Sequence, residues 1–328
     1  MNKILVTGGS GFLGFSLVKK LLEKNYNVVV YDNNFRGNFK KFQTNNFKKI
    51  TLIKGDIRDE EKLNKAVKKC NTIIHLAFIN GTKNFYLKPK LVLDVGVDGT
   101  IKILKASLKS NKVKRFIYAS SSEVYHKPKK IPANEKEFLT IPDPHNPRFS
   151  YSSAKIIGEI LTLNLLRNSK IIHNIFRPHN IFGPQMGFEH VIPDLIKKIY
   201  LASSEFKKKN CSLKIQGSGN ETRSFCFIDD AVTQIINISL KGKNKEIYNI
   251  GQKNEISIKK LINDISKILK IKIKINVGKL LQGSVKRRCP DIQKITKLGK
   301  FNNTYYKGLE KTVIWYKKYY LNKKFKSN

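Results

Sequence analysis

A glycine-rich turn between an apolar strand and an amphipathic helix constrains the fold of this chain more than any other feature. The residues from Lys3 to Thr7 predict a short buried strand, and those from Phe12 to Glu23 predict a helix. Gly8, Gly11 and Gly14 are spaced three residues apart, in the turn between this strand and this helix and at the start of the helix. At such a turn the free N–H groups of the first helical turn face an anion, and the helix dipole favours negative charge there. The turn therefore predicts a binding site for a phosphate group.

An acidic residue at the end of the next strand makes the turn typical of a dinucleotide site. The residues from Val28 to Asp32 predict a second apolar strand, and Asp32 is its last residue. In this pattern the glycines let the backbone approach a pyrophosphate, and the acid binds a ribose hydroxyl. Asp32 favours NAD over NADP, although Arg36 nearby leaves a 2′-phosphate possible.

Composition excludes several other classes of protein. The formal net charge is +40, but the excess is lysine spread along the chain, without a helix-turn-helix, RNP or zinc-finger pattern. We therefore expect no specific nucleic-acid partner, only a positive surface that attracts anionic substrates. The four cysteines form no CxxC pair, so we expect no disulfide framework and no metal site. No apolar run approaches the ~20 residues of a membrane span, and no signal-peptide pattern precedes the first strand, so we expect a cytoplasmic protein without a membrane segment.

Strands and helices alternate along the first half of the chain. Further strands are predicted at 50–54, 72–77, 115–119 and 171–177, with helices from Asp59 to about 69, over 90–110 and over 151–168. Asp59 and Ser150 are the expected caps of two of these helices. The alternation predicts a Rossmann-type, doubly wound parallel α/β sheet. We assign residues 1–177 to a dinucleotide-binding domain, with a return near 224–250. Residues 178–223 and 251–328 form a smaller C-terminal α/β substrate domain.

A tyrosine and a lysine provide the first candidate for chemistry. Tyr151 and Lys155 stand at positions i and i+4 of a predicted long helix, on one face. A nearby ammonium favours tyrosinate, so we expect the pKa of Tyr151 to be lowered toward neutral pH, where a phenol can accept a proton from a hydroxyl. Ser121, Ser122 and Glu123 follow the strand at 115–119, at the sheet edge where doubly wound folds place active sites.

Together these residues resemble the NAD-dependent epimerase/dehydratase family, the extended short-chain dehydrogenase/reductases that modify nucleotide sugars. The motifs that carry the likeness are the glycine turn, Asp32, Gly55-Asp56, His75-Leu-Ala77, Ser121 and the Tyr151/Lys155 pair. Later segments continue it: Arg177-Pro-His-Asn-Ile-Phe-Gly-Pro184, Gly217 to Arg223, and Arg287-Arg-Cys-Pro-Asp291.

The resemblance implies retained NAD that oxidises C4 of a nucleotide-diphosphate sugar, with Tyr151 as base and Ser121 orienting the hydroxyl. The cofactor residues that it implies are Gly8, Gly11, Phe12, Leu13, Gly14, Asp32, Asn33, Asp56, Ile57, Leu76, Ala77, Tyr151, Lys155 and Pro178. The substrate contacts that it implies are Asn180, Val191, Arg223 and Arg288. It also implies a homodimer through the helices near 90–110 and 151–168.

The family's branches differ at a few positions. Glu123 resembles the glutamate of 4,6-dehydratases, and Ser121-Ser122-Glu123 also fits UDP-glucuronate decarboxylases, whereas simple 4-epimerases usually lack a carboxylate there. Ser122 in place of aspartate is unlike the dTDP-glucose dehydratases, and the segment from Phe78 to Thr82 is unlike the decarboxylases. Gly96 replaces an asparagine that supports the lysine in related enzymes. The exact reaction stays open, and an NAD-binding sensor or scaffold without catalysis is the alternative from another class.

Overall fold

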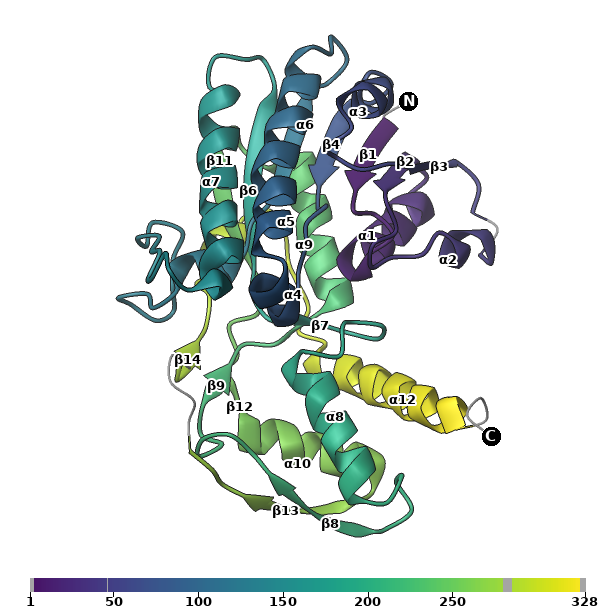
Figure 1. Ribbon diagram of the computed structural model, residues 1–328, viewed down its shortest axis with the longest axis vertical. Helices are drawn as coiled ribbons and strands as arrows, with labels where there is room; N and C mark the ends of the chain where they lie inside the picture. Colours follow the sequence, from purple (N-terminus) through teal and green to yellow (C-terminus); the bar gives the residue numbers. More distant parts are fainter. Residues whose placement is uncertain (1–2, 46, 280–284, 325–328) are drawn as a thin grey trace.

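A seven-stranded parallel sheet forms the centre of the molecule (Figure 1). A computed structural model describes residues 3–45, 47–279 and 285–324. Across the sheet the strand order is β11-β6-β5-β4-β1-β2-β3, which reverses direction between β1 and β4. The predicted doubly wound sheet is confirmed. Its strands are β1 (Lys3–Thr7), β2 (Asn27–Asp32), β3 (Ile50–Lys54), β4 (Thr72–His75), β5 (Arg115–Ala119), β6 (Ile172–Pro178) and β11 (Glu246–Ile250).

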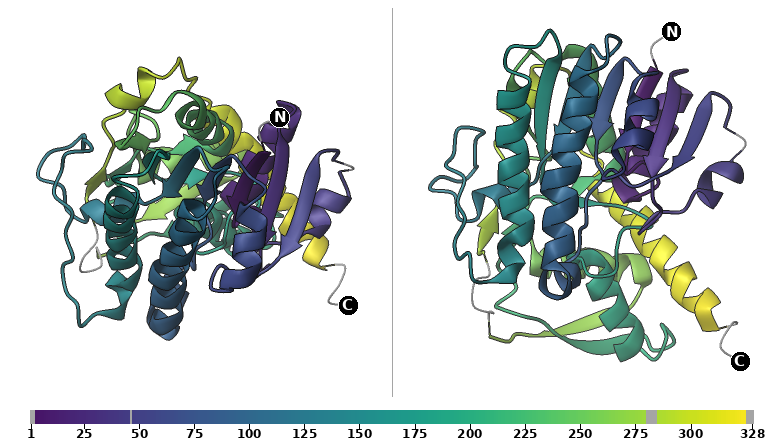
Figure 2. Two further views of the ribbon diagram at one scale, coloured as in Figure 1. Left: turned by 90° about the horizontal axis from the view of Figure 1, so that it is seen from above. Right: turned by 45° about the horizontal axis from the view of Figure 1, so that its top comes forward.

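Alternate side chains of the strands enter two apolar layers, one on each face of the sheet. In β1, Ile4 and Val6 join one buried cluster and Leu5 joins the other. Both layers are covered by helices, which is why these strands are apolar at nearly every position. Helices α1 (Phe12–Glu23) and α9 (Ile228–Lys241) contribute to the first layer. Helices α3 (Glu60–Val67), α5 (Pro89–Leu93) and α6 (Gly99–Leu108) contribute to the second, and α7 (Ser150–Leu165) lies beside α6 (Figures 1 and 2).

The helix expected over 90–110 is interrupted. A single π-helical turn, η1 (Asp94–Asp98), separates α5 from α6, and Gly96 is its central residue. A Cβ at Gly96 would lie 2.6 Å from the Phe78 ring and 2.9 Å from the Ala154 Cβ. The turn therefore packs too closely against its neighbours to carry a side chain at position 96. Such π turns are frequent at functional sites.

One of the two expected helix caps is confirmed. The Asp59 carboxylate accepts a hydrogen bond from the Lys62 N–H at the start of α3, as expected. The Ser150 prediction is wrong, because Ser150 is already the first residue of α7. A short 3₁₀ turn, η3 (Pro147–Phe149), precedes it, and Asn146 caps that turn by accepting from the Arg148 N–H. α7 itself follows Phe149 and has no side-chain cap, so the asparagine caps the preceding turn rather than the long helix.

The rest of the chain folds against the carboxyl edge of the sheet and below it (Figure 1). Its outer part consists of the parallel strands β8 (Asn210–Lys214) and β13 (Lys272–Asn276) and the helices α8 (Val191–Ala202), α10 (Ile258–Leu269) and α12 (Tyr305–Lys324). The helix α12 is longer than the helix expected at 309–319. The division of the chain into domains stays a prediction, and its last four residues, 325–328, lie outside the described residues. The remaining elements are α2 (Lys40–Gln43), α4 (Thr82–Leu87), η2 (Ser122–Tyr125), β7 (Ile181–Phe182), β9 (Thr222–Arg223), β10 (Cys226–Phe227), β12 (Ile256–Ser257), β14 (Arg287–Arg288) and α11 (Gln293–Thr296).

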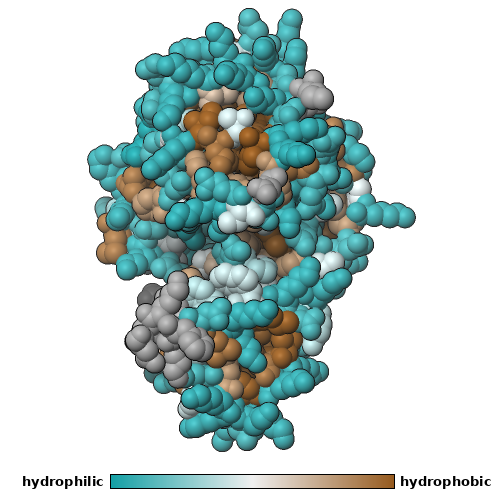
Figure 3. All heavy atoms as spheres, turned by 90° about the vertical axis from the view of Figure 1, so that its right-hand side faces the viewer, coloured by the Kyte–Doolittle hydropathy of each residue, from teal (hydrophilic) through white to brown (hydrophobic). Residues whose placement is uncertain are grey.

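Hydrophilic residues predominate on the face seen from the β3 side, and hydrophobic residues form separate patches among them (Figure 3). Within residues 3–45, 47–279 and 285–324, no helix combines the length and the apolar character that crossing a membrane requires.

Candidate active site

The glycine turn forms one wall of a groove at the carboxyl edge of the sheet. Gly8 has a φ of +68°, and a Cβ on it would lie 2.7 Å from the Ala77 backbone nitrogen. Only glycine fits this position without strain. Gly11 precedes the first turn of α1 without a side-chain cap, so N–H groups there are available to an anion.

The groove has a volume of 630 Å³ and contains every residue of the predicted cofactor set. It follows the point where the strand order reverses, between β1 and β4, which is where doubly wound sheets bind ligands. The predicted residues that line it are Gly8, Gly11, Phe12, Leu13, Gly14, Asp32, Asn33, Asp56, Ile57, Leu76, Ala77, Tyr151, Lys155 and Pro178. Residues as far apart in the sequence as Gly8 and Pro178 thus line the same groove.

The carboxylate of Asp32 is fixed by the backbone around it. One oxygen accepts from the Ser10 N–H at 3.0 Å and the other from the Asn34 N–H at 2.8 Å. The same carboxylate keeps lone pairs that ribose hydroxyls can use. Arg36, which left a 2′-phosphate possible, donates instead to the Asn80 carbonyl oxygen at 3.1 Å and so joins two walls of the groove.

Tyr151 and Lys155 line the groove, and Ser121 lies beside Tyr151. Tyr151 and Lys155 lie in the first turns of α7, and the Ser121 side chain, two residues after the end of β5, is near enough to the Tyr151 phenol to lower its pKa. The Lys155 side chain is 3% exposed, and its Nζ donates to the Ala119 carbonyl oxygen at 2.6 Å. The Tyr151 ring stacks on Phe85 with centroids 4.8 Å apart. These contacts fix the phenol toward the strand end.

The expected lowering of the Tyr151 pKa is wrong for the structure as it stands. Burial raises the pKa of Tyr151 to about 12, and Glu123 adds to the rise, while the Ser121 hydrogen bond opposes it. Burial likewise lowers the pKa of Lys155 to about 7, and only Glu159 opposes that shift. The Lys155 Nζ lies 5.9 Å from the Tyr151 ring centroid. Desolvation of both groups therefore outweighs their attraction.

Glu123 lies in an ion pair that the sequence did not predict. Ser122 and Glu123 belong to η2, where the Ser121 hydroxyl accepts from the Glu123 N–H. The Arg288 Nη1 donates to the Glu123 carboxylate at 2.6 Å, and an Arg148 nitrogen lies 3.7 Å from its other oxygen. Burial alone would raise the pKa of Glu123, but Arg288 and Arg148 outweigh it and lower the pKa. The carboxylate is therefore held in its charged form.

The predicted substrate residues fall into two groups. Arg223 on β9 and Arg288 on β14 are partners in a parallel pair, and Asn180 donates to the Ser224 carbonyl oxygen next to Arg223. Burial and the nearby Arg288 lower the pKa of Arg223. Val191 is instead the first residue of α8 and is exposed. The structure therefore brings three of the four residues toward one positively charged end.

Several residues of the groove went unnoticed in the sequence. The segment from Gln185 to His190 closes one side, and Phe35, Phe78 and Asn80 line others. Tyr316 on α12 donates to the Met186 carbonyl oxygen and fixes that segment. None of these residues belongs to a recognisable pattern. Only their position after a strand that ends at the groove could have indicated them.

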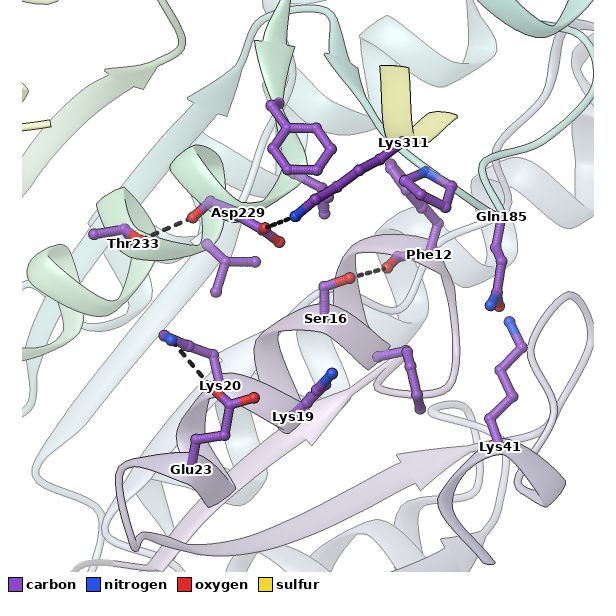
Figure 4. Close-up of a pocket in the computed structure, with 15 residues that line it drawn as sticks. Phe12, Ser16, Lys19, Lys20, Glu23, Lys41, Gln185, Asp229, Thr233 and Lys311 are labelled. Carbon is purple, nitrogen blue, oxygen red and sulfur yellow. Dashed lines mark hydrogen bonds and ion pairs between the residues drawn. The ribbon is translucent and has the colours of Figure 1, made fainter. Parts of the chain in front are cut away.

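A second hollow of 410 Å³ lies on the outer side of α1 and α9 (Figure 4). Its rim carries Lys20, paired with Glu23, and Lys311, 3.9 Å from Asp229. Of the predicted site residues it shares only Phe12 with the groove. Across the described parts of the chain, no cluster of His, Cys, Asp and Glu side chains is arranged to hold a metal ion.

Comparison with known proteins places the chain in a family. Residues 4–251 match the model of the NAD dependent epimerase/dehydratase family. The chain belongs to this family. It is 30% identical over 329 residues to the UDP-N-acetyl-alpha-D-glucosaminuronate decarboxylase of Bacillus cytotoxicus, covering 96% of this chain and 98% of that one. It is 33% identical over 322 residues to the putative UDP-glucose 4-epimerase of Methanocaldococcus jannaschii, again covering 96% and 98%.

Solved structures agree with this assignment. The UDP-glucuronic acid 4-epimerase of Bacillus cereus, in complex with UDP-glucuronic acid and NAD, has a TM-score of 0.82 with this chain at 28% identity. The alignment covers 97% of this chain and 99% of that one. The family depends on NAD, and the groove fits that cofactor: the Gly8 turn has no room for a side chain, α1 is uncapped, and Asp32 lies at the end of β2. The chain is therefore an NAD-dependent member of a family of nucleotide-sugar epimerases, dehydratases and decarboxylases.

Proposed function

We propose that the chain oxidises C4 of a nucleotide-linked hexose, acts on the 4-keto sugar, and then has the same hydride returned to the sugar, so that the retained cofactor ends each turnover oxidised. The observation that carries this proposal is that Tyr151 and Lys155 both line the cofactor groove, with Ser121 beside Tyr151. NAD, when bound, accepts the hydride from C4. The residues of the chain handle the proton and hold the sugar.

Tyr151 is the proposed base for the C4 hydroxyl. Ser121 lies beside its phenol and lowers the pKa of Tyr151, so the two hydroxyl groups together are the proposed pair that orients the sugar oxygen and takes up its proton. Burial raises the pKa of Tyr151 to about 12, which makes the neutral phenol the resting form. The positive charges of Lys155 and of the site once loaded must offset this rise for proton transfer to proceed.

Arg223 and Arg288 are the proposed partners of the substrate diphosphate. Two guanidinium groups on adjacent strands repel one another, and burial adds to the cost of the charge on Arg223. A diphosphate between them would relieve both penalties, and arginine binds phosphate oxygens in pairs. Asn180, which lies beside Arg223 through Ser224, is placed to bind the same group.

Glu123 is the proposed group that acts on the 4-keto intermediate. A carbonyl at C4 acidifies the C5 proton; Glu123 would remove this proton and pass it to the C6 hydroxyl, which leaves as water and gives a 4-keto-5,6-ene. Arg288 keeps Glu123 ionised in the structure. When the substrate diphosphate takes Arg288 as a partner, the carboxylate becomes free to accept a proton. Return of the C4 hydride to C6, with a proton added at C5 to balance the one taken from the C4 hydroxyl, would complete the reaction of a 4,6-dehydratase.

Decarboxylation of a uronate is the second candidate, favoured by the two arginines at Glu123. Arg288 and Arg148 provide positive charge at the sugar end, where a C6 carboxylate would need it. After oxidation at C4, that carboxylate is lost as CO₂ and the electron pair is taken up by the carbonyl. The printed name of the Bacillus cytotoxicus relative is that of such a decarboxylase.

A panel of nucleotide sugars separates these reactions. We would incubate the purified protein with UDP-, dTDP- and GDP-hexoses and with UDP-uronates, follow the nicotinamide absorbance, and weigh the products by mass spectrometry. Loss of water indicates the dehydratase, loss of CO₂ the decarboxylase, and a product of unchanged mass the 4-epimerase. If no sugar alters the absorbance or forms a product, the chain is an NAD-binding sensor or scaffold and the proposal is wrong.

We also propose a homodimer through α6 and α7. Leu108, Ile160 and Leu165 are exposed apolar residues on or beside these two helices. Burying them against a second copy would remove apolar surface from water. Light scattering of the purified protein, compared with an Ile160→Asp variant, tests this association.

A further inference from the structure

The ring of Phe78 lies against the catalytic pair. The Lys155 Nζ is 3.8 Å from the centroid of the Phe78 ring, nearer than the rings of Tyr118 at 5.1 Å and Tyr151 at 5.9 Å. Phe78 also meets the Tyr151 ring edge to face, with centroids 5.1 Å apart and an interplanar angle of 84°. One side chain therefore contacts both members of the pair.

The missing side chain at position 96 makes room for this ring. A Cβ on Gly96 would approach two atoms of the Phe78 ring, at 2.6 and 2.8 Å. Any residue larger than glycine at position 96 would therefore displace the Phe78 ring from Lys155. The resemblance leads one to expect an asparagine at position 96. This chain has Gly96 instead, and the ring of Phe78, from the segment after β4, occupies the space beside it.

The contacts of the Lys155 ammonium show what the ring contributes. One N–H donates to the Ala119 carbonyl oxygen at 2.6 Å. The carboxylate of Glu159 favours the charged lysine, but its oxygens already accept from Arg177 and Ser120. The Phe78 face is therefore the nearest aromatic surface that can stabilise the buried ammonium. Cation–π attraction is strongest when both partners are removed from water.

We propose that Phe78 is a positioning residue that seats Lys155 as an ammonium between the Ala119 carbonyl and Tyr151, and that Gly96 is the glycine that permits this arrangement. The consequence for catalysis rests on the proposed function, because only there does Tyr151 need a neighbouring positive charge. The seating of Lys155 itself does not depend on it. The two can therefore be tested separately.

The seating is measured by NMR on protein labelled with ¹³C at the lysine Cε. Protons that lie over a ring face are shifted upfield, and the Cε protons next to the Lys155 Nζ, itself 3.8 Å from the Phe78 ring centroid, are expected to show this shift. The Lys155 signal is assigned by its loss in Lys155→Met. In Phe78→Leu we expect the upfield shift to disappear and the Lys155 pKa to fall by about one unit, since cation–π attraction of this size corresponds to that shift. Phe78→Tyr keeps the ring face and should restore both.

The matched control is Phe85→Leu, since Phe85 stacks on Tyr151 at 4.8 Å but is not in cation–π contact with Lys155. It should leave the Lys155 titration unchanged. An unaltered Lys155 signal and titration in Phe78→Leu, or an equal change in Phe85→Leu, would overturn the proposal.

A second measurement links the seating to catalysis. If charged Lys155 is required, the alkaline limb of the kcat profile moves to lower pH in Phe78→Leu by the same amount as the NMR titration, with little change in KM. If the Lys155 titration changes in Phe78→Leu but the alkaline limb of the kcat profile stays at the same pH, charged Lys155 is not required for catalysis and that part of the proposal is wrong. Absence of turnover by the unaltered protein on every nucleotide sugar refutes the proposed function, while the NMR result still decides the role of Phe78.

Discussion

Replacing the buried Lys155 by methionine should change how stability depends on pH. Burial lowers the pKa of Lys155 from 10.5 to about 7 in the folded chain. Between these values the unfolded chain holds a proton that the folded chain has lost, so the free energy of unfolding rises with pH. From about pH 7 to about pH 9 this group adds about 2 kcal/mol of stability to the wild-type protein, allowing for half-protonation at the lower pH. Lys155→Met lacks this contribution.

Urea unfolding of both proteins, measured in parallel at several pH values, provides the assay. Other titrating groups contribute equally to the two curves, so the difference between them isolates Lys155. Lys105→Met, at an exposed position on α6, controls for the loss of one surface charge. A difference between wild type and Lys155→Met that stays constant over this pH range would refute the assigned pKa and the burial argument behind it.

Three further substitutions test the site. Tyr151→Phe keeps the ring contacts with Phe85 but removes the phenol, so cofactor reduction by a nucleotide sugar should fall by about a hundredfold or more while thermal stability is kept, which absorbance and melting curves would show. Glu123→Gln should leave cofactor reduction intact and block dehydration or decarboxylation; unimpaired product formation, read by mass spectrometry, would contradict its role. Gly8→Ala places a Cβ 2.7 Å from the Ala77 nitrogen at a φ of +68°, so we expect a loss of about 1–3 kcal/mol in unfolding experiments together with loss of bound NAD; a protein that keeps both would show that the turn can shift.

Most of the sheet could be predicted because its pattern is local. The limits of β1, α1, β3 and β5 match the prediction, since short apolar runs and a glycine turn depend only on neighbours in the chain. The break at η1 could not be predicted in the same way. It depends on the approach of Phe78 and Ala154 to Gly96, from other segments. The error at Ser150 has a similar origin, because Asn146 turns the chain earlier.

The candidate site likewise contains residues that local motifs indicate and contacts that only distant segments form. The cofactor residues follow strand ends and a helix start, so motif and order were enough to select residues that all line one groove. The pair of Glu123 and Arg288 joins residues 165 positions apart, and no spacing in the sequence indicated it. Arg36 was noticed only as a residue that left a 2′-phosphate possible, and its hydrogen bond to the Asn80 carbonyl oxygen could not be predicted because it joins residues 44 positions apart.

The sequence by itself determined the strand–turn–helix at Gly8, the alternation that builds a parallel sheet, and the Tyr151/Lys155 pair, because each is encoded within a few neighbouring residues. Only the tertiary structure decided how charged those residues are and what surrounds them. Burial reversed the expected direction of the Tyr151 pKa and placed Lys155 against the Phe78 ring. Desolvation is set by every segment that packs on a group, so it appears only when the whole chain has folded.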